Sequence, residues 1–295
     1  MNLSVVIPMY NREYTISPAI ISVLNQTVHP MEIVVVDDCS KDNSVQIVRE
    51  LCSKYKMIRL IQLRRNRGAQ AARNRGIRAA KGEWILLLDS DDELVCNAIE
   101  FLIRAVENNP GYDVYYGDYY RKENDKMHYK NCRMRGKDGN YLRSILFSSK
   151  VLFSGPLIRK SALYDIGMLD ETVPSYQEWD THIRLSQTHK YYYIGKPVFI
   201  YNIHGGETIS KDGKKDIRGF RYVMRKNGNL FLEEGGIQSI ILYYQEMHFR
   251  CRRCNDHRQY YYLSVKNLIQ FVSANTFLEK CIVKLFRHIW IKNRL

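Results

Sequence analysis

The stretch EWILLLDSDDE, residues 83–93, carries the pattern on which the fold prediction rests. A run of apolar residues leads directly into three aspartates, Asp89, Asp91 and Asp92. A continuous apolar run of this length is typical of a strand that is covered on both faces of a parallel sheet. Carboxylates so close together repel one another and raise one another's pKa. The aspartate cluster therefore needs a function that offsets this repulsion.

The same pattern recurs on both sides of this stretch. Apolar runs predict further strands over residues 3–8, 32–38, 57–63 and 112–118. Helical patterns lie between them, over residues 14–26, 43–54 and 69–80 and from the aspartates to residue 108. Strands that alternate with helices predict an α/β fold of the Rossmann-like kind, with a mostly parallel sheet flanked by helices.

Polar residues follow three of these predicted strands where each strand ends. Tyr10 and Asn11 follow the first, Asp38 the second and Asp89 the fourth. Ligands bind to such sheets beyond the carboxyl ends of the strands. The sequence therefore predicts a ligand site at this edge.

Two interpretations of the aspartate cluster follow from its position. If the strand continues to residue 91, Asp89 and Asp91 lie on one face. Paired carboxylates of this kind suit Mg²⁺ or Mn²⁺. Alternatively, Asp91 or Asp92 caps the next helix, whose first turn favours negative charge. Capping accounts for one aspartate but not for three.

The rest of the chain is less regular until its last third. Residues 151–160 predict a strand, 177–187 a helix, and 190–204 two strands around a Gly-Lys-Pro turn, and helical patterns continue from about 214. The chain carries a net charge of +14, of which +10 lies between Ser210 and Leu295. Such a charge suggests an anionic partner. The seven cysteines are irregularly spaced and fit free thiols in a reducing compartment. We expect neither a signal peptide nor a membrane-spanning helix.

Five motifs occur in an order and spacing that resemble the glycosyltransferase family 2 proteins of the GT-A fold. They are VVIPMYNRE (5–13), VVVDDCSKDNS (34–44), NRGAQAARNRG (66–76), GEWILLLDSDDE (82–93) and YQEWDTHIRL (176–185). The resemblance covers about residues 1–205. It implies a mostly inverting enzyme that uses a nucleotide-diphospho-sugar. A composition shift near residues 205–215 predicts a boundary between a catalytic domain at 1–209 (a nucleotide-binding half, 1–118, and an acceptor half, 119–209) and a basic helical region at 210–295.

The resemblance also implies roles for individual residues. The nucleotide-sugar is expected to lie against Pro8, Tyr10, Asn11, Glu13, Asp38, Arg73, Asp89 and Ser90. Asp38 would bond the pyrimidine ring, and Asp89 the ribose or donor sugar. Asp91, with help from His204, would hold Mn²⁺ or Mg²⁺ on the diphosphate. From the residues alone, Asp38 could equally be a turn former and Arg73 a solvated helix residue.

The motif YQEWD is expected to supply the general base and part of the acceptor site. Glu178 stands where the family usually has an aspartate, and Asp180 is its rival. The two side chains lie about 200° apart on a helix, so both cannot face one site. We expect Glu178 to be the base and place Trp179 and Asp180, with Asp92, on the acceptor side.

Two features of the basic C-terminal region suggest partners. The first is a set of residue types that bind zinc: His248, Cys251, Cys254 and His257. Their spacing of three along one helix spreads them too widely to bind one ion. The segment 277–295 is amphipathic, with apolar and basic faces. It predicts either a helix lying on an anionic membrane or one packed on its own domain.

The sequence thus favours a cytoplasmic glycosyltransferase at the inner face of the cell membrane. Its partners would be a nucleotide-sugar donor, most commonly a UDP-sugar, and a saccharide or lipid-linked saccharide acceptor of cell-surface polysaccharide synthesis. A non-catalytic sugar-nucleotide-binding scaffold is the main alternative. The net charge also suggests nucleic-acid binding as a further hypothesis. No nucleic-acid-binding motif is visible, however, and we expect no such partner.

Overall fold

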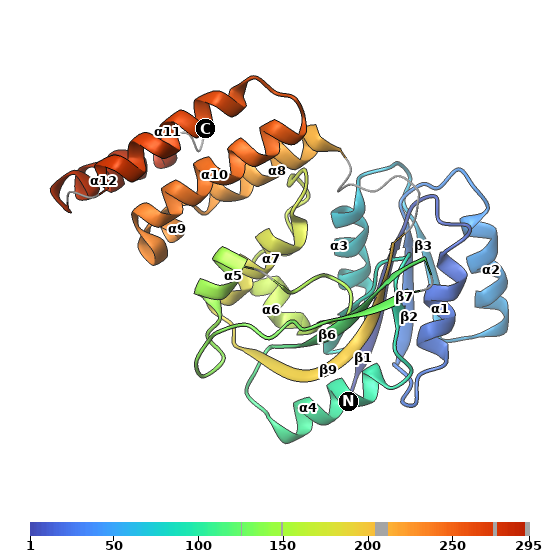
Figure 1. Cartoon of the computed structure of the whole chain (residues 1–295). Coiled ribbons are helices and arrows are strands. Elements are labelled where there is room, and N and C mark those ends of the chain that lie inside the picture. Colours follow the sequence, from blue (N-terminus) through green and yellow to red (C-terminus); the bar gives the residue numbers. More distant parts are fainter. Residues whose placement is uncertain (125, 149, 204–211, 274–275, 293–295) are drawn as a thin grey trace. The chain divides into compact units, whose positions relative to one another are not determined.

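The computed structural model of the chain describes residues 1–124, 126–148, 150–203, 212–273 and 276–292 (Figure 1). His204, one of the predicted metal ligands, lies outside these residues. The chain forms two units, each considered by itself. The first comprises residues 1–171 and 178–205, and the second comprises residues 172–177 and 206–295. The short segment 172–177 therefore belongs with the C-terminal region, although it lies far from it in the sequence.

The first unit is built on one mixed sheet. Its strands are β1 (Leu3–Met9), β2 (Glu32–Asp37), β3 (Ile58–Gln62), β4 (Trp84–Leu87), β5 (Glu93–Leu94), β6 (Val114–Glu123), β7 (Lys126–Lys130), β8 (Leu157–Arg159) and β9 (Tyr191–Asn202). They run in the order β3-β2-β1-β4-β8-β6-β9-β5, with β7 paired to β6. Strands β1 to β4 are mutually parallel, as predicted, and β6 is parallel to β9.

Helices cover the parallel half on both faces. They are α1 (Ile16–Leu24), α2 (Ser44–Lys54), α3 (Ala69–Ala79) and α4 (Ala98–Asn108), followed by α5 (Leu142–Ser148), α6 (Lys160–Asp165) and α7 (Gln177–Ser186). Alternate residues of β1, among them Val5 and Ile7, join α1, α2 and α4 in the main core. Val6 faces α3 instead, where a Cβ on Gly76 would lie 2.3 Å from its Cγ1. Glycine thus lets α3 lie directly on the sheet.

The α/β class, the mostly parallel sheet and the helical C-terminal region are confirmed, although β8 is antiparallel to both its neighbours, β4 and β6. Two details of the prediction are wrong. Only residues 157–159 of the predicted strand 151–160 are strand, because the chain turns before them at Gly155, whose φ is +97°. Residues 191–202 form one long strand with an irregular register opposite Asp118, not two strands around a turn.

The second unit is helical. It contains α8 (Gly213–Lys226), α9 (Gly228–Gly235), α10 (Ile237–Arg253), α11 (Arg258–Val272) and α12 (Thr276–Lys292). Aromatic side chains form much of its core: Phe220 stacks on Tyr243, and Tyr244 meets both Tyr262 and Phe286. Within the described part of the chain, no helix combines the length and apolarity needed to cross a membrane.

Of the four residues considered for zinc, His248 and Cys251 lie on α10, and Cys254 and His257 follow its end. Cys251 is fully buried, whereas Cys254 is exposed, and His248 Nδ1 lies 2.9 Å from the carbonyl oxygen of Gln259. Among the described residues, no three or more His, Cys, Asp or Glu side chains converge as a metal cluster. The expectation that the four residues share one helix is wrong, because α10 ends at Arg253, before Cys254 and His257.

Candidate active site

The aspartate cluster lies in a turn rather than on a strand. Strand β4 ends at Leu87, and the backbone N–H of Asp92 donates to the carbonyl of Asp89 at 3.1 Å. The condition under which Asp89 and Asp91 would share one face of a strand is therefore not met. The capping alternative is also wrong, because α4 begins at Ala98 with Asn97 at its N-cap. The aspartates are thus presented by a tight turn at the carboxyl end of β4.

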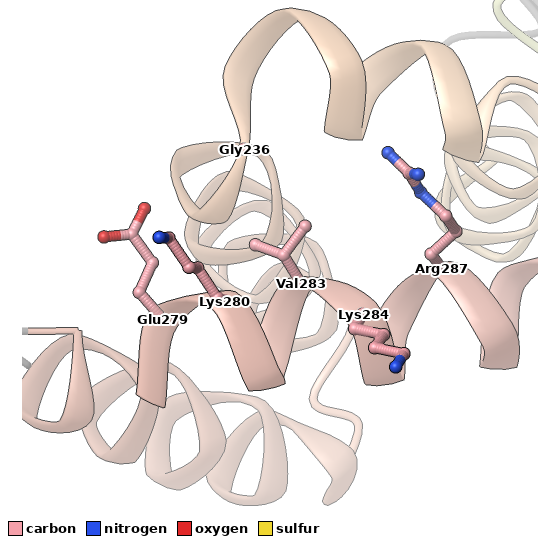
Figure 2. Close-up of a pocket in the computed structure, with 6 residues that line it drawn as sticks. All are labelled: Gly236, Glu279, Lys280, Val283, Lys284 and Arg287. Carbon is pink, nitrogen blue, oxygen red and sulfur yellow. The ribbon is translucent and has the colours of Figure 1, made fainter. Parts of the chain in front are cut away.

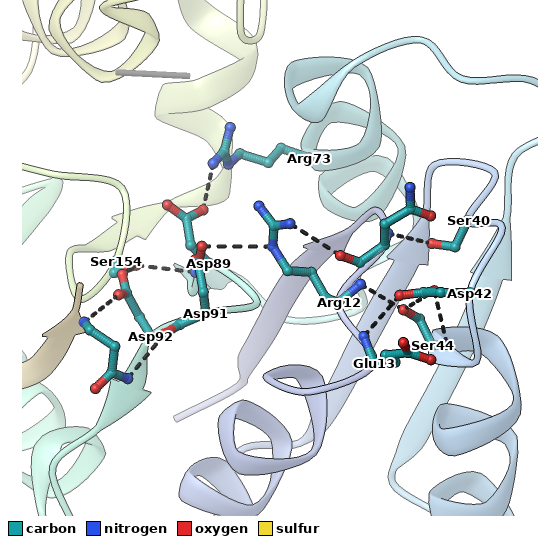
Figure 3. A network of polar contacts seen from close by, with 12 residues as sticks. Arg12, Glu13, Ser40, Asp42, Ser44, Arg73, Asp89, Asp91, Asp92 and Ser154 are labelled. Carbon is teal, nitrogen blue, oxygen red and sulfur yellow. Dashed lines mark hydrogen bonds and ion pairs between the residues drawn. The ribbon is translucent and has the colours of Figure 1, made fainter. Parts of the chain in front are cut away.

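Asp89 is held by a buried arginine. Arg73 is 5% exposed, and its Nη2 lies 2.5 Å from Oδ1 of Asp89 (Figure 3). The same guanidinium donates to Oε1 of Gln70 at 2.8 Å and lies 4.3 Å from the centre of the Phe153 ring. Arg73 is therefore a positioned partner of Asp89 and not a solvated helix residue. Its contact with a nucleotide stays a prediction.

Asp91 lies at the accessible side of the turn. Its Oδ2 is 3.7 Å from Nε of Arg12, and the two side chains are 27% and 34% exposed (Figure 3). Ion pairs with this exposure contribute about 0–1 kcal/mol. Arg12 itself is placed by its backbone N–H, which donates to Oγ of Ser44 at 2.7 Å. The Arg12–Asp91 ion pair therefore contributes little to stability.

Asp92 is an anchor beneath the turn. It is 2% exposed, accepts from Oγ of Ser154 at 2.5 Å and from the backbone N–H of Asn202 at 3.2 Å. Ser154 Oγ also accepts from the N–H of Asp89 at 3.1 Å. Burial raises the pKa of Asp92 well above its usual value, and the charges of Asp89 and Asp91 add to the effect. Its carboxyl group therefore supports the turn from inside, and Ser90, 6% exposed, is nearly as enclosed.

The ends of β1 and β2 meet beside this turn. Tyr10 is 42% exposed, whereas Pro8 is buried within β1. Asn11 has a φ of +51°, donates its N–H to Oγ of Ser40 at 2.9 Å and accepts from the N–H of Lys41 at 2.8 Å. These bonds join the loops that follow the two strands. The predicted edge of the sheet is thus formed by residues from both loops.

Two predicted nucleotide ligands bond to backbone in the structure. Oδ1 of Asp38 accepts from the N–H of Arg67 at 2.8 Å and Oδ2 from Gly68 at 2.7 Å, and the side chain is buried. Burial raises the pKa of Asp38 despite these two bonds. Glu13 accepts from the backbone and side chain of Asn43 at 3.1 and 2.9 Å. Both carboxylates therefore shape the loops of the site, and their contact with a pyrimidine or ribose stays a prediction.

Helix α7 separates the two candidate bases. Glu178 is half-buried at its first turn, and burial raises the pKa of this carboxyl, while the charge of Arg73 lowers it and that of Asp89 raises it. Asp180 is fully buried, and its Oδ2 accepts from Nε of Arg184 at 2.9 Å. Glu178 thus shares the electrostatic environment of the Asp89–Arg73 pair, whereas Asp180 belongs to an internal ion pair.

The ion pair of Asp180 holds the chain that precedes α7. Arg184 Nη1 donates to the carbonyl oxygens of Ile166 and Met168 at 2.7 and 2.6 Å. Trp179 is held separately, since its Nε1 donates to the carbonyl of Ile145 at 2.8 Å. The two residues that follow Glu178 on the helix therefore anchor α7 within the first unit. Acceptor contact by Trp179 stays a prediction.

Sequence reasoning missed Tyr201 and Asn202 at the end of β9. Nδ2 of Asn202 donates to the carbonyl of Asp91 at 3.0 Å and to Oε1 of Glu93 at 3.1 Å. Burial raises the pKa of Tyr201, and the charges of Asp92, Asp91, Asp89 and Glu178 raise it further, in that order. Its hydroxyl group therefore lies in the field of these four acids. Only its place at a strand's carboxyl end could have pointed to it.

Several known proteins are similar to this chain in sequence. A family model described as Glycosyl transferase family 2 matches residues 4–167. An uncharacterized glycosyltransferase of Haemophilus influenzae is 26% identical over 216 residues, which are 68% of this chain and 68% of that protein. Chondroitin synthase of Escherichia coli is 26% identical over 227 residues, 73% of this chain but 31% of the synthase. The chain thus spans less than a third of that larger relative.

A solved structure shares the fold. Residues 1–349 of Staphylococcus aureus TarS, in complex with UDP-GlcNAc, superpose with a TM-score of 0.64 at 22% identity. The match covers 85% of this chain and 72% of the TarS chain. The family model spans more than half of the residues here and includes both strand ends and the aspartate turn. The chain therefore belongs to glycosyl transferase family 2.

Proposed function

We propose that the chain is an inverting glycosyltransferase that moves a sugar from a UDP-sugar to a hydroxyl group of a saccharide or lipid-linked saccharide. The acceptor would belong to the synthesis of a cell-surface polysaccharide. Family membership supports sugar transfer, the UDP-GlcNAc complex of TarS favours a uridine nucleotide, and chondroitin synthase is a relative named for a polysaccharide. The observation that carries the proposal is the geometry of the turn after β4, where buried Arg73 bonds to Asp89 and Asp91 is partly exposed.

The residues at the turn fit a divalent cation bound together with a diphosphate. Asp91 offers one partly exposed carboxylate whose arginine partner is 3.7 Å away, and Asp92 is occupied inside the protein. Mg²⁺ commonly takes one or two carboxylates and completes its shell with phosphate oxygens and water. Asp91 would therefore hold Mn²⁺ or Mg²⁺. When bound, such an ion neutralises the charge that develops on the departing diphosphate.

Glu178 is the proposed general base. Its carboxylate accepts the proton of the acceptor hydroxyl as that oxygen bonds to the anomeric carbon. The bond from the anomeric carbon to the diphosphate oxygen breaks on the opposite side, so the configuration inverts and UDP leaves. The raised pKa of Glu178 makes it a better proton acceptor than an exposed glutamate. Asp89, held by Arg73, would orient the sugar or ribose of the donor.

The test begins with the donor and then removes the base. A panel of UDP-, GDP- and dTDP-sugars with Mn²⁺ identifies the donor by the thermal shift it produces. Transfer to water is then followed as UDP release, with Glu178→Gln and, as a control just past the end of α7, Gln187→Glu. We expect Glu178→Gln to lose about 10²–10⁴-fold in rate while it keeps its donor affinity. Wild-type turnover in Glu178→Gln would contradict the assignment.

We also propose that α12 contacts an anionic membrane surface. Leu278, Leu285 and Ile289 are 40%, 56% and 38% exposed, and their spacing of seven and four places them on one helical face. Exposed Lys280, Lys284 and Arg287, called here the α12 cations, lie on the opposite side of the helix, because about 100° of rotation separates successive residues. Exposed apolar and cationic side chains on one helix fit the boundary between lipid headgroups and acyl chains.

A pocket on the same helix supports this surface assignment. It measures about 390 Å³ and lies between the turn at Gly236 and α12, where Glu279, Val283 and the α12 cations line it. Figure 2 shows Arg287 on the side of α12 that faces Gly236, whereas Lys284 points away. Positive charge dominates the lining, as expected for a surface that meets lipid phosphates.

Vesicle flotation tests the membrane proposal with the full chain. The variant replaces all three α12 cations with glutamine, and the control replaces Lys54, Lys56 and Arg64, which are exposed on the first unit. We expect wild type and control to float with vesicles that contain phosphatidylglycerol, and the α12 variant to stay in the bottom fraction. Equal flotation of both variants would refute the assignment to α12.

A further inference from the structure

The segment 172–177 joins two parts of the protein through the chain itself. Residues just before it are held in the first unit: Nδ2 of Asn74 donates to the carbonyl of Leu169 at 2.8 Å and to Oε1 of Glu171 at 3.0 Å. The segment then packs within the helical unit. The next residue is Glu178, the base of the proposed function, on which this inference rests.

A cluster of three polar side chains fixes this segment within the helical unit. The hydroxyl of Tyr176 donates to Oδ1 of Asp216 and accepts from Nη2 and Nε of Arg250 at 2.9 and 3.2 Å. Arg250 Nε also lies 3.4 Å from Oδ2 of Asp216, and these two side chains are 12% and 18% exposed. The three residues are called the Tyr176 cluster below.

The Tyr176 cluster is largely buried, so its bonds are stronger than those of a surface ion pair. The Arg250 guanidinium lies 4.1 Å from the centre of the Phe220 ring, which closes one side of the cluster. Burial, with the bond to Asp216, raises the pKa of Tyr176 to about 12, so its hydroxyl stays protonated and donates at neutral pH. Charged hydrogen bonds with little access to water are stronger than exposed ones. The cluster therefore restrains Tyr176 strongly.

The backbone of the segment lies directly on α8. A Cβ on Gly219 would be 2.0 Å from Oγ and 2.7 Å from the carbonyl oxygen of Ser175. Ser175 Oγ donates to the carbonyl of Lys215 at 2.9 Å, and Oγ1 of Thr172 lies 2.8 Å from the hydroxyl of Tyr222. The segment is thus held along its length, at both the side chains and the backbone.

The conformation of Tyr176 shows that these contacts decide the path of the chain. Its φ is +61°, in the left-handed region that costs a residue with a Cβ about 1–2 kcal/mol. Such a conformation persists only where the surroundings over-determine it. Gln177, the first residue of α7, follows at once. Two peptide units of about 3.8 Å each separate the Cα atoms of Tyr176 and Glu178.

We propose that Tyr176, Asp216 and Arg250 are positioning residues for the general base Glu178. They set the backbone path at the start of α7 and so the place of the Glu178 carboxylate. A base must lie within hydrogen-bond reach of its proton, and an error of about 1 Å can cost on the order of 10²-fold in rate. The C-terminal helices therefore contribute to catalysis through the segment 172–177, without any residue of theirs touching substrate.

The experiment removes one hydroxyl group. Tyr176→Phe keeps the ring and deletes the bonds to Asp216 and Arg250, and Tyr260→Phe deletes an exposed hydroxyl on α11 as the control. The assay measures UDP release from the selected donor with Mn²⁺, UDP affinity by calorimetry, and the pH profile. We expect kcat to fall about 10–100-fold, with UDP affinity within twofold of wild type and a displaced acidic limb. Tyr260→Phe should match wild type.

A second variant covers the case in which Tyr176→Phe does not fold. Arg250→Lys keeps the cation but loses the forked contact, and we expect the same fall in kcat at unchanged UDP affinity. Wild-type kcat in the folded variant would overturn the proposal, as would a parallel loss of UDP affinity. Glu178→Gln, run alongside, separates the two hypotheses. Its full activity refutes the base assignment itself, whereas an inactive Glu178→Gln with a normal Tyr176→Phe refutes only the positioning role.

Discussion

The substitution Asp180→Asn tests which acid on α7 has a structural role and which has a catalytic role. The carboxylate of Asp180 is fully buried, and its partner Arg184 is 16% exposed. The substitution leaves the guanidinium inside the protein without its carboxylate. Breaking a buried ion pair in this way costs about 3–5 kcal/mol. Arg184 keeps its bonds to the carbonyls of Ile166 and Met168 and some access to water. We therefore expect the lower end, about 3 kcal/mol.

The loss should appear in stability and not in chemistry. For a unit of roughly 200 residues, about 3 kcal/mol corresponds to a fall in Tm of about 6–12 °C. At 20 °C the Asp180→Asn protein should stay folded and turn over within a fewfold of wild type. Glu178→Gln should show the opposite pattern, with an unchanged or higher Tm, since it removes a half-buried charge, and with little turnover.

Two measurements on the same preparations decide the matter. Thermal unfolding by circular dichroism gives the Tm, and UDP release at 20 °C gives the rate. The reasoning is refuted if folded Asp180→Asn is inactive while Glu178→Gln turns over normally. It is also refuted if Asp180→Asn leaves the Tm unchanged, because the Asp180–Arg184 pair would then contribute nothing to stability.

Four further predictions concern the site and the sheet. The rate should fall as pH drops through the raised pKa of Glu178, because the protonated carboxyl cannot accept a proton, and Glu178→Gln should lack this limb in a pH-rate profile. Calorimetry with Mn²⁺ and UDP should show weaker binding for Asp91→Asn but not for Asp92→Asn, and equal losses would contradict the division of roles. Asp92→Asn should also leave the Tm at pH 7 unchanged or higher, since it replaces a carboxyl whose charged form burial disfavours. Gly76→Ala should lower the free energy of unfolding by about 1–3 kcal/mol, because the new Cβ would meet Val6, and an unchanged urea midpoint would count against the packing described here.

Local patterns were enough to predict the parallel half of the sheet. Apolar runs over β1 to β4 and the helices between them have strong periodicity, and the observed bounds differ from the predicted ones by about two residues. The rest of the sheet was less predictable because β8 is three residues long and pairs antiparallel between strands distant in sequence. Short strands carry little periodic signal, so their pairing depends on the surrounding core.

The candidate site was also predictable from the sequence only in part. The acids at the strand ends are visible in the sequence, because parallel strands bring their carboxyl ends to one edge. Their separate environments are not visible. Asp89 meets Arg73, Asp91 lies near Arg12, and Asp92 is enclosed by Ser154 from a distant loop. Such partners depend on long-range packing, which no local spacing encodes.

The sequence by itself determined the fold class, the family resemblance and the edge of the sheet at which the acids gather. Those features follow from hydrophobic periodicity and from motifs whose residues are close together in the chain. Only the tertiary structure decided which acid is exposed. It also decided that Asp180 forms an ion pair, whereas Glu178 lies in the field of Asp89. In the same way it brought Tyr176 to Arg250, 74 residues away. The physical reason is that burial and charge pairing depend on which distant residues meet in space.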